Sequence, residues 1–296
     1  MQKITNSSTE TFLLCRRKHY YSYVKCIKPR WEGWPLFDGK VYHDAQHQYY
    51  SGVSEENVLL SIDKQFDSLD DQGFDTLKNK ALVRGMFRGY ACIYAADEFE
   101  DIEPEVSFSV EVPSAAIEGK SFIIAGKTDA RVRRNVKPYL LEHKTTSEAS
   151  ITRYLETLNL ADQPNFYLYG YNREMKNAAI GVIYRIVVKS KIRQLKAETE
   201  DAFLARLEQV YIDDAMKPEE LRKHYFEETI YRSPAEQAEW FVELCQKAAN
   251  MDNYFPYKST GQCYHWGKAC EFNTLCQGGD IGENFVKKSS QHEELE

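Results

Sequence analysis

A change in hydrophobic periodicity near residue 100 constrains the fold of this chain more than any other feature. Before it, apolar residues recur at helical spacing, as Leu82 and Met86 do. Over 106–112, apolar and polar residues alternate, which is the period of a β-strand. Strand patterns continue over 122–125, 127–133 and 139–142, with a short turn at Asn135–Val136. The sequence therefore predicts helices first and a sheet after them.

Helices and one further strand are expected around this sheet. Ser7 and Glu10 form a capping box, so a first helix should begin near Ser8 and carry residues up to Tyr23. Ser233 and Glu236 form a second capping box. A long apolar run over 179–188 predicts a buried strand, and 31–38 predicts a loop. The other expected helices are 40–50, 55–69, 76–97, 162–172, 200–215 and 234–250.

The 296 residues contain neither an evident linker nor an internal repeat, so we expect a single domain over 1–296. Its predicted class is α/β, with a mixed central sheet flanked by helices and helical decoration from the N-terminal third. Within it we expect a mainly helical part, a catalytic sheet core, a helical part with a cysteine cluster, and a frayed polar tail. These parts are 1–100, 101–190, 191–280 and 287–296.

Charge and hydropathy exclude several classes of protein. The formal net charge of −7 argues against coating nucleic acid through bulk charge, so any binding should use local basic patches such as 16–18, 131–137 and 189–196. No window approaches about 18 consecutive apolar residues, which excludes a membrane-spanning helix. The N-terminus is polar and lacks the apolar core of a secretion signal. We therefore expect a cytoplasmic protein without a membrane partner.

Two carboxylates and a lysine follow the apolar strand pattern closely. Glu142 and Lys144 are two residues apart on a predicted strand and should project to the same face, with a hairpin bringing Asp129 beside them. Carboxylate oxygens suit Mg²⁺ or Mn²⁺, and a metal held there can polarise a phosphoryl oxygen and lower the pKa of a bound water. The alternative is a surface hairpin with a cross-strand salt bridge.

The seven cysteines are unevenly distributed. Cys263, Cys270 and Cys276 are spaced C-x6-C-x5-C, and Cys15 is the best candidate for a fourth thiolate. Four thiolates are the usual ligand set of an iron–sulfur cluster or of structural zinc. The segment lacks the C-x2-C knuckle of most zinc sites, which favours the cluster, although zinc remains an alternative.

These motifs resemble those of the PD-(D/E)XK nuclease superfamily, in its RecB-like exonuclease branch. Asp129 stands in G-K-T-D-A, and Glu142-His143-Lys144 matches E-x-K. Glu105 and Glu111 both resemble a further acidic residue of the first core strand. The resemblance runs from about Cys15 to Cys276. Two helical motifs complete it, namely G-x-x-x-H ending at His43 and Q-x-x-x-Y at Gln163 and Tyr167.

The resemblance implies a restriction-endonuclease-like core and a role for each matching residue. Asp129, Glu142 and the backbone carbonyl of His143 would hold Mg²⁺ or Mn²⁺, with His43 as a further ligand. Lys144 would be the catalytic lysine. Gln163 and Tyr167 would contact the nucleic-acid strand. The four cysteines resemble those of family members that carry a [4Fe–4S] cluster joining the two ends of the domain, which here means Cys15, Cys263, Cys270 and Cys276.

The expected function is a divalent-metal-dependent DNA exonuclease acting on single-stranded or end-bearing DNA. One alternative is an end-trimming nuclease within a CRISPR-adaptation or recombination complex. Another is a non-catalytic DNA-binding subunit, against which the intact set of Asp129, Glu142 and Lys144 argues. The sequence contains no recognisable base-reading module and no Walker A motif, so neither sequence-specific readout nor an ATPase motor is expected.

Overall fold

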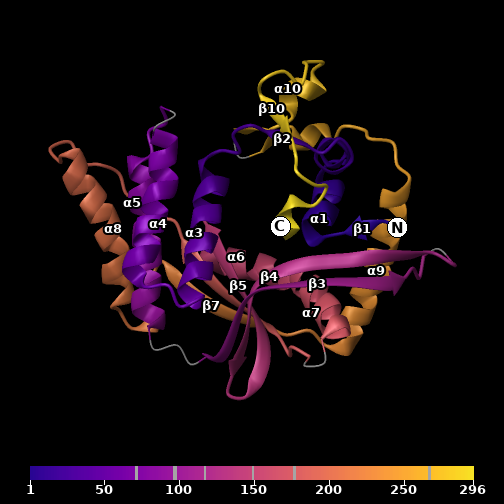
Figure 1. Cartoon of the computed structure of the whole chain (residues 1–296), viewed down its shortest axis with the longest axis horizontal. Helices are drawn as coiled ribbons and strands as arrows, with labels where there is room; N and C mark the ends of the chain where they lie inside the picture. Colours follow the sequence, from indigo (N-terminus) through magenta and orange to yellow (C-terminus); the bar gives the residue numbers. More distant parts are fainter. Residues whose placement is uncertain (71–72, 96–98, 117, 149, 176–177, 266–267) are drawn as a thin grey trace.

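A mixed six-stranded sheet forms the centre of the molecule (Figure 1). The computed structural model describes residues 1–296 apart from 71–72, 96–98, 117, 149, 176–177 and 266–267. The strands of the sheet are β1 (Lys3–Ile4), β3 (Phe99–Pro113), β4 (Ser121–Arg134), β5 (Lys137–Thr146), β6 (Val182–Val188) and β7 (Tyr225–Ile230). Their order is β1-β4-β5-β6-β7, with β3 also paired to β4. The pairs β1–β4 and β5–β6 are parallel and the others antiparallel.

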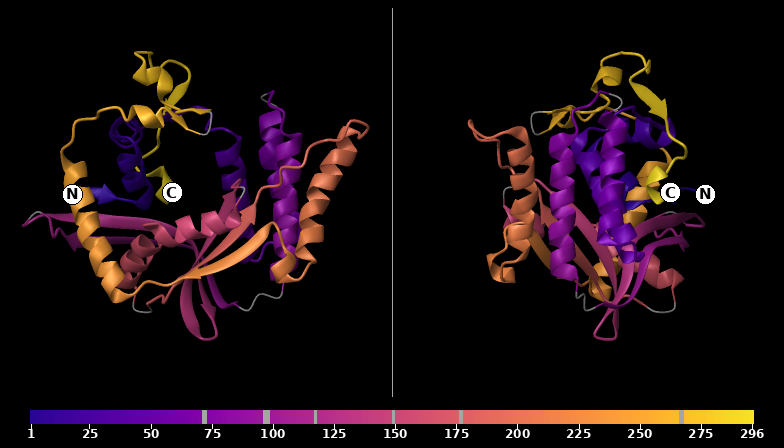
Figure 2. Two further views of the ribbon diagram at one scale, coloured as in Figure 1. Left: turned by 180° about the vertical axis from the view of Figure 1, so that it is seen from behind. Right: turned by 60° about the vertical axis from the view of Figure 1, so that its left-hand side comes forward.

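Helices flank the sheet, so the predicted α/β class with a mixed central sheet is confirmed. The longer helices are α1 (Asn6–Leu14), α3 (Trp34–Tyr50), α4 (Glu55–Asp70), α5 (Leu77–Tyr94), α6 (Ile151–Leu160), α7 (Gln163–Glu174), α8 (Glu200–Ala215) and α9 (Pro234–Asp252). Helices α3, α4, α5 and α8 stand together at one end of the molecule, and α7 and α9 lie at the other (Figures 1 and 2). Among the described helices, none has the length and apolar character needed to cross a bilayer.

Shorter elements join the two ends of the chain. Strand β2 (Ile27–Pro29) pairs with β10 (Phe285–Lys287), and β8 (Tyr264–His265) pairs with β9 (Lys268–Ala269). The pairing of β2 with β10 places the C-terminal segment against the N-terminal one, as Figure 1 shows. The remaining short helices are α2 (Arg16–His19), α10 (Asn273–Cys276), the π-helical turn η1 (Tyr20–Val24), and the 3-10 turns η2 (Glu219–Leu221), η3 (Thr260–Gln262) and η4 (Glu293–Leu295).

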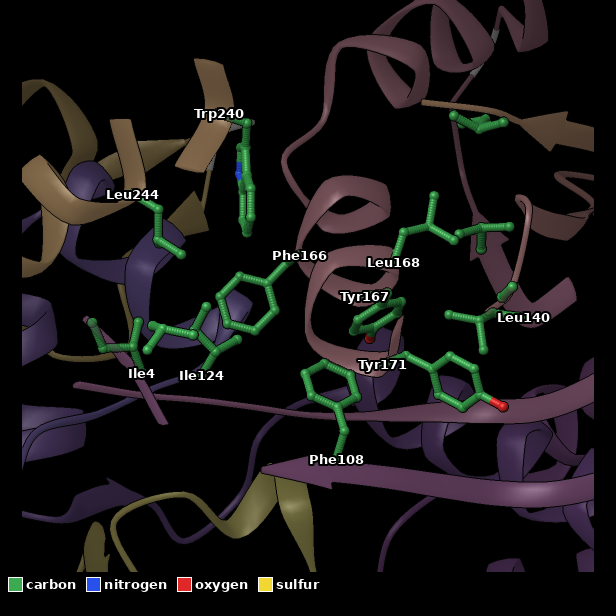
Figure 3. Close-up of a cluster of buried hydrophobic side chains, with 14 of the residues drawn as sticks. Ile4, Phe108, Ile124, Leu140, Phe166, Tyr167, Leu168, Tyr171, Trp240 and Leu244 are labelled. Atoms are coloured by element: carbon green, nitrogen blue, oxygen red, sulfur yellow. The ribbon is translucent and has the colours of Figure 1, made fainter. Parts of the chain in front are cut away.

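The largest hydrophobic core lies between the sheet, α7 and α9 (Figure 3). Phe108 of β3 packs there beside Phe166 and Tyr167 of α7. Its ring fills the space where Gly126 and Gly170 lack a side chain. Fully burying a large apolar side chain contributes roughly 1.5–3 kcal/mol, so this core fixes α7 on the sheet. A second core joins α3, α4, α5 and α8.

Several local expectations are confirmed. The capping box of Ser233 and Glu236 opens α9, and α8 covers the predicted 200–215. Asn135 and Val136 both adopt positive φ, 52° and 66°, at the turn between β4 and β5. Such left-handed pairs suit the right-handed twist of a two-residue hairpin.

The first helix differs from its prediction. Thr5, not Ser7, caps it, and Ser8 completes the capping box. Glu10 instead accepts a hydrogen bond from the side chain of Asn6. The helix ends at Leu14 because Cys15 is extended, with φ −160° and ψ 115°, so the expected continuous helix to Tyr23 is broken into α1, α2 and η1.

Other boundaries also differ from the predictions. Helix α3 begins at Trp34 inside the expected loop, since Pro35 is compatible with a first helical turn. Helix α6 and strand β7 were not predicted, although apolar and polar residues mix in both segments. The helix expected over 76–97 ends at Tyr94, and its last two predicted residues lie outside the described part. The N-terminal third, although mainly helical, also adds β1 to the sheet.

The segment 287–296, predicted to be a frayed polar tail, packs against the N-terminal helices. Glu294 accepts hydrogen bonds from Thr5 (2.7 Å) and Tyr23 (3.3 Å). Glu293 pairs with Lys28 at 2.8 Å. Polar side chains of segment 287–296 therefore form hydrogen bonds and an ion pair with the N-terminal part of the chain. Composition alone could not indicate these contacts.

Candidate active site and cysteine cluster

Asp129 lies where two paired strands separate. The β4–β5 ladder runs from Arg134 opposite Lys137 to Ala130 opposite Leu141 and stops there, while both strands continue with other partners. One residue beyond the ladder, the carboxylate of Asp129 accepts the backbone N–H of His143 at 2.6 Å. The Asp129 side chain thus pairs a backbone N–H of β5 that has no backbone partner on β4. This hydrogen bond holds the carboxylate beside β5.

Glu142 is the second carboxylate, with 5 % of the residue exposed. Its Oε1 accepts hydrogen bonds from Lys144 Nζ at 2.8 Å and from Gln163 Nε2 at 3.2 Å. Gln163 also donates to the hydroxyl of Tyr167 at 2.9 Å, and both residues belong to the start of α7. The structure therefore brings Gln163 of the Q-x-x-x-Y pair directly to Glu142, with Tyr167 bonded to Gln163.

His43 reaches the same place from α3. Its Nδ1 lies 3.1 Å from Asp129 Oδ1. The residues predicted for the site therefore converge from α3, β4, β5 and α7, although the sequence separates them widely. Of the two competing acidic residues, Glu105 lies near this site, and Glu111 bonds Ser121 instead.

A cleft of about 570 Å³ opens over Asp129 between α3 and the sheet. Besides Glu105, the cleft contains charged or titratable residues that received no role in the predicted site, among them His47, Lys127 and Glu294. His47 follows His43 by one helical turn, so both lie on the same face of α3. This spacing could have identified His47 from the sequence. Glu105 has φ 51° and lies between Pro104 and Val106, whose β4 partners Ala130 and Thr128 flank Asp129. Glu294 arrives from the far end of the sequence, so no local pattern could predict it.

The two carboxylates have pKa values displaced in opposite directions. Burial acts to raise the pKa of Asp129, but His43 and His143 outweigh it and hold that pKa well below its usual range. Burial raises the pKa of Glu142, and the opposing effect of Lys144 only partly offsets it. Burial would lower the pKa of His43, but the Asp129 carboxylate raises it. Burying these charged groups costs free energy of desolvation. Perturbed pKa values of this kind are common at functional sites.

The donors present fit a divalent metal ion. Glu142 Oε2 is buried and has no hydrogen-bond partner among the described residues. A buried carboxylate oxygen without a partner is costly, and a cation would satisfy it. In the described part of the chain, no three Cys, His, Asp or Glu side chains form a preassembled metal cage. Lys144 Nζ contacts Glu142 and His43 Nδ1 contacts Asp129 directly, so each carboxylate already has a side-chain partner.

The four predicted cluster cysteines line one cavity of about 310 Å³. The backbone N–H of Ser259 lies 3.5 Å from Cys15 Sγ, and that of Cys270 donates to the carbonyl of Cys263 at 2.8 Å. Burial raises the pKa of Cys276, and Lys258 and Arg17 only partly offset this effect. The extended backbone at Cys15 thus turns the chain toward a cavity whose sulfur donors suit a soft metal.

Part of the predicted basic surface is already paired with carboxylates. Arg131 contacts Glu103 at 2.9 Å, and Arg134 contacts Glu227 at 2.6 Å. Lys189 is buried against Asp38 at 3.1 Å. These three cations stabilise the protein internally, so they are poor candidates for lining a nucleic-acid groove.

Comparison with known proteins assigns the family. The model of the PD-(D/E)XK nuclease superfamily matches residues 3–277, and the chain belongs to this superfamily. Membership indicates a metal-dependent nuclease. The solved structure titled "Crystal structure of SSO0001" is similar at 15 % identity and a TM-score of 0.39, covering 94 % of this chain and 87 % of that one. No curated protein sequence matches the chain.

Proposed function

We propose that the protein is a divalent-metal-dependent DNA exonuclease of the RecB-like branch that its motifs resemble. The observation that carries the proposal is the convergence of Asp129, Glu142 and Lys144. Asp129 and Lys144 line one cleft, and Lys144 holds Glu142, whose Oε2 is buried and lacks a hydrogen-bond partner among the described residues. A hairpin salt bridge alone would not require this burial, which desolvates charged groups at a cost.

The site residues divide the chemistry between them. A divalent metal, when bound, polarises a phosphoryl oxygen and lowers the pKa of a water. Asp129, Glu142, His43 and the backbone carbonyl of His143 would hold it. Lys144, anchored on Glu142, would stabilise negative charge that develops on the phosphate. Gln163 and Tyr167 lie beside Glu142 and would contact the DNA strand near the scissile bond.

The test is digestion of end-labelled single- and double-stranded DNA with Mg²⁺, Mn²⁺ or EDTA. Cleavage should require the metal and should fall by at least about 10²–10³-fold in Asp129→Asn, Glu142→Gln and Lys144→Ala, because each removes a charge used in the transition state. Glu111→Gln, an exposed carboxylate on β3, is the matched control for Glu142→Gln. Near-wild-type turnover by Asp129→Asn would contradict the site.

Dependence on a DNA end is a separate part of the proposal. The support is the absence of any recognised base-reading motif in the sequence, together with the resemblance to a branch whose members often degrade from ends. Linear single-stranded DNA should be degraded much faster than a circle of the same sequence at equal salt. Equal rates, or discrete fragments from the circle, would indicate an endonuclease.

We also propose a [4Fe–4S] cluster held by Cys15, Cys263, Cys270 and Cys276. The support is that all four thiols line one cavity. A cluster occupies more space than a single zinc ion, and about 310 Å³ leaves room for it. Protein purified without oxygen should contain iron and sulfide. Zinc without iron in such a preparation would contradict the cluster.

A further inference from the structure

The ring of His143 contacts both the Asp129 carboxylate and a buried tyrosine. Its neighbours Glu142 and Lys144 meet at the side of α7, whereas the His143 side chain, 1 % exposed, faces α3 and α5. Nδ1 lies 3.3 Å from Asp129 Oδ2, and Nε2 lies 3.0 Å from the hydroxyl of Tyr90. The superfamily motif leaves this position unspecified, so the role of the ring must come from its contacts.

The hydroxyl of Tyr90 is held in turn by Arg185. The guanidinium Nη1 donates to Tyr90 at 3.0 Å and to Tyr50 at 2.5 Å, while Nε donates to Glu227 at 3.0 Å. Arg185 stands on β6 directly opposite His143 of β5 in the register. The path from Glu227 through Arg185 and Tyr90 to His143 therefore ends at Asp129.

The burial of Arg185 within an apolar strand requires a physical explanation. Arg185 is 2 % exposed in a strand whose other residues, Val182–Val188, are apolar or aromatic. The rings of Tyr94 and Phe99 lie 3.5 and 4.4 Å from its Cζ. Burying a cation costs several kcal/mol, and a well-packed apolar side chain is often at least as stabilising there. Fold stability alone therefore gives little reason for an arginine at this position.

The donors set the direction of the hydrogen bonds. A guanidinium only donates, so the oxygens of Tyr90 and Tyr50 both accept from Arg185. The two hydroxyls also contact each other, and when Tyr50 donates to Tyr90, the proton of Tyr90 is available to His143 Nε2. A neutral imidazole that accepts at Nε2 carries its proton on Nδ1, which faces Asp129. Asp129 Oδ2 accepts the backbone N–H of His143 and lies 3.3 Å from the ring Nδ1 of the same residue, a close contact whose geometry does not make a hydrogen bond.

We propose that Tyr90 and Arg185 are positioning residues that, through the His143 ring, hold Asp129 and the His143 backbone in the geometry that binds the metal. This inference rests on the proposed nuclease function. Groups behind metal ligands typically change metal affinity by about 10–100-fold when they are removed. The effect should therefore appear as weaker metal binding rather than as weaker DNA binding.

The test measures Mn²⁺ binding by calorimetry in the absence of DNA. Tyr90→Phe should raise the Mn²⁺ dissociation constant at least about tenfold. Tyr42→Phe is the matched control, because the Tyr42 hydroxyl is buried on α3 with no hydrogen-bond partner among the described residues, and its ring contacts Tyr90. That control should bind Mn²⁺ as the wild type does. At saturating Mn²⁺, Tyr90→Phe should keep the wild-type KM for DNA and recover most of kcat.

A double substitution separates positioning from packing. His143→Leu should weaken Mn²⁺ binding, and adding Tyr90→Phe should weaken it no further, because both act through one ring. Wild-type affinity in Tyr90→Phe, an equal loss in Tyr42→Phe, or additive losses in the double variant would overturn the inference while leaving the proposed function intact. A wild-type protein that binds no Mn²⁺ would overturn the metal site and this inference together.

Discussion

Asp129 and Glu142 show how far residue spacing predicts a site. Their strand positions and the E-x-K spacing predicted that the two carboxylates lie near Lys144; Lys144 contacts Glu142, and Asp129 contacts the backbone of the adjacent His143. Spacing could not reveal that the β4–β5 ladder stops one residue before Asp129, because strand separation depends on the partners of both strands. Arg185 could have been recognised from the sequence as a residue with buried partners, because a charge within an apolar run is costly to bury unless it is paired.

A prediction at this scale concerns the fit of Phe108 between two glycines. In Gly170→Ala, the new Cβ would overlap the Phe108 ring. Overpacking of this kind should lower the free energy of unfolding by about 1–3 kcal/mol, measured by chemical denaturation. Gly261→Ala, where nothing lies within 4 Å, is the control. Phe108→Leu should restore part of the loss in Gly170→Ala, and its failure to do so would contradict the proposed overlap.

At the scale of elements, local signals were most reliable where the chain caps its own helices. The Ser233 and Glu236 capping box identified α9, whereas the same rule chose Ser7 at the first helix, where Thr5 and Ser8 form the box. Two possible capping boxes overlap at the start of α1, and the sequence alone could not decide which of them forms. The turn η1 and segment 287–296 were harder still to predict, since Tyr23 of η1 contacts Glu294 and His292 and the two segments position each other.

The burial of His19 in α2 predicts a pH dependence of stability. Burial, with smaller contributions from His292 and Lys288, lowers the pKa of His19 to about 4. Its ring also meets Tyr23 and Tyr254. The unfolded chain takes up a proton below about pH 6.5 while the folded protein does not, so the free energy of unfolding should decrease as pH falls toward 4.

The expected contribution of His19 is about 3 kcal/mol between pH 6.5 and 4. Denaturation of the wild type and of His19→Gln at both pH values measures it, because titration of all other groups is common to the two proteins. The variant should lose less stability over this interval. Equal losses would mean that His19 stays accessible to protons in the folded protein.

At the scale of the whole molecule, the two ends of the chain are joined twice. Strand β2 pairs with β10, and Cys15 shares a cavity with three cysteines from the C-terminal segment. The periodicity predicted the α/β class, but it could not place these ends together, since contacts between distant segments have no local pattern. Only the uneven cysteine distribution indicated that the two ends meet. A cluster usually needs four thiolates, so the three cysteines near the C-terminus required a fourth from elsewhere in the chain.

The last prediction follows from this closure. If the four thiols hold a cluster, Cys15→Ala should behave as Cys276→Ala does, losing iron and melting at a lower temperature, because metal binding contributes directly to folding. Cys92→Ala, an exposed cysteine on α5, is the control and should keep iron and thermal stability. Iron and sulfide content with thermal melting of each variant measures both effects. Full iron in Cys15→Ala alongside loss in Cys276→Ala would exclude Cys15 as a ligand, and the cluster would then join only C-terminal segments.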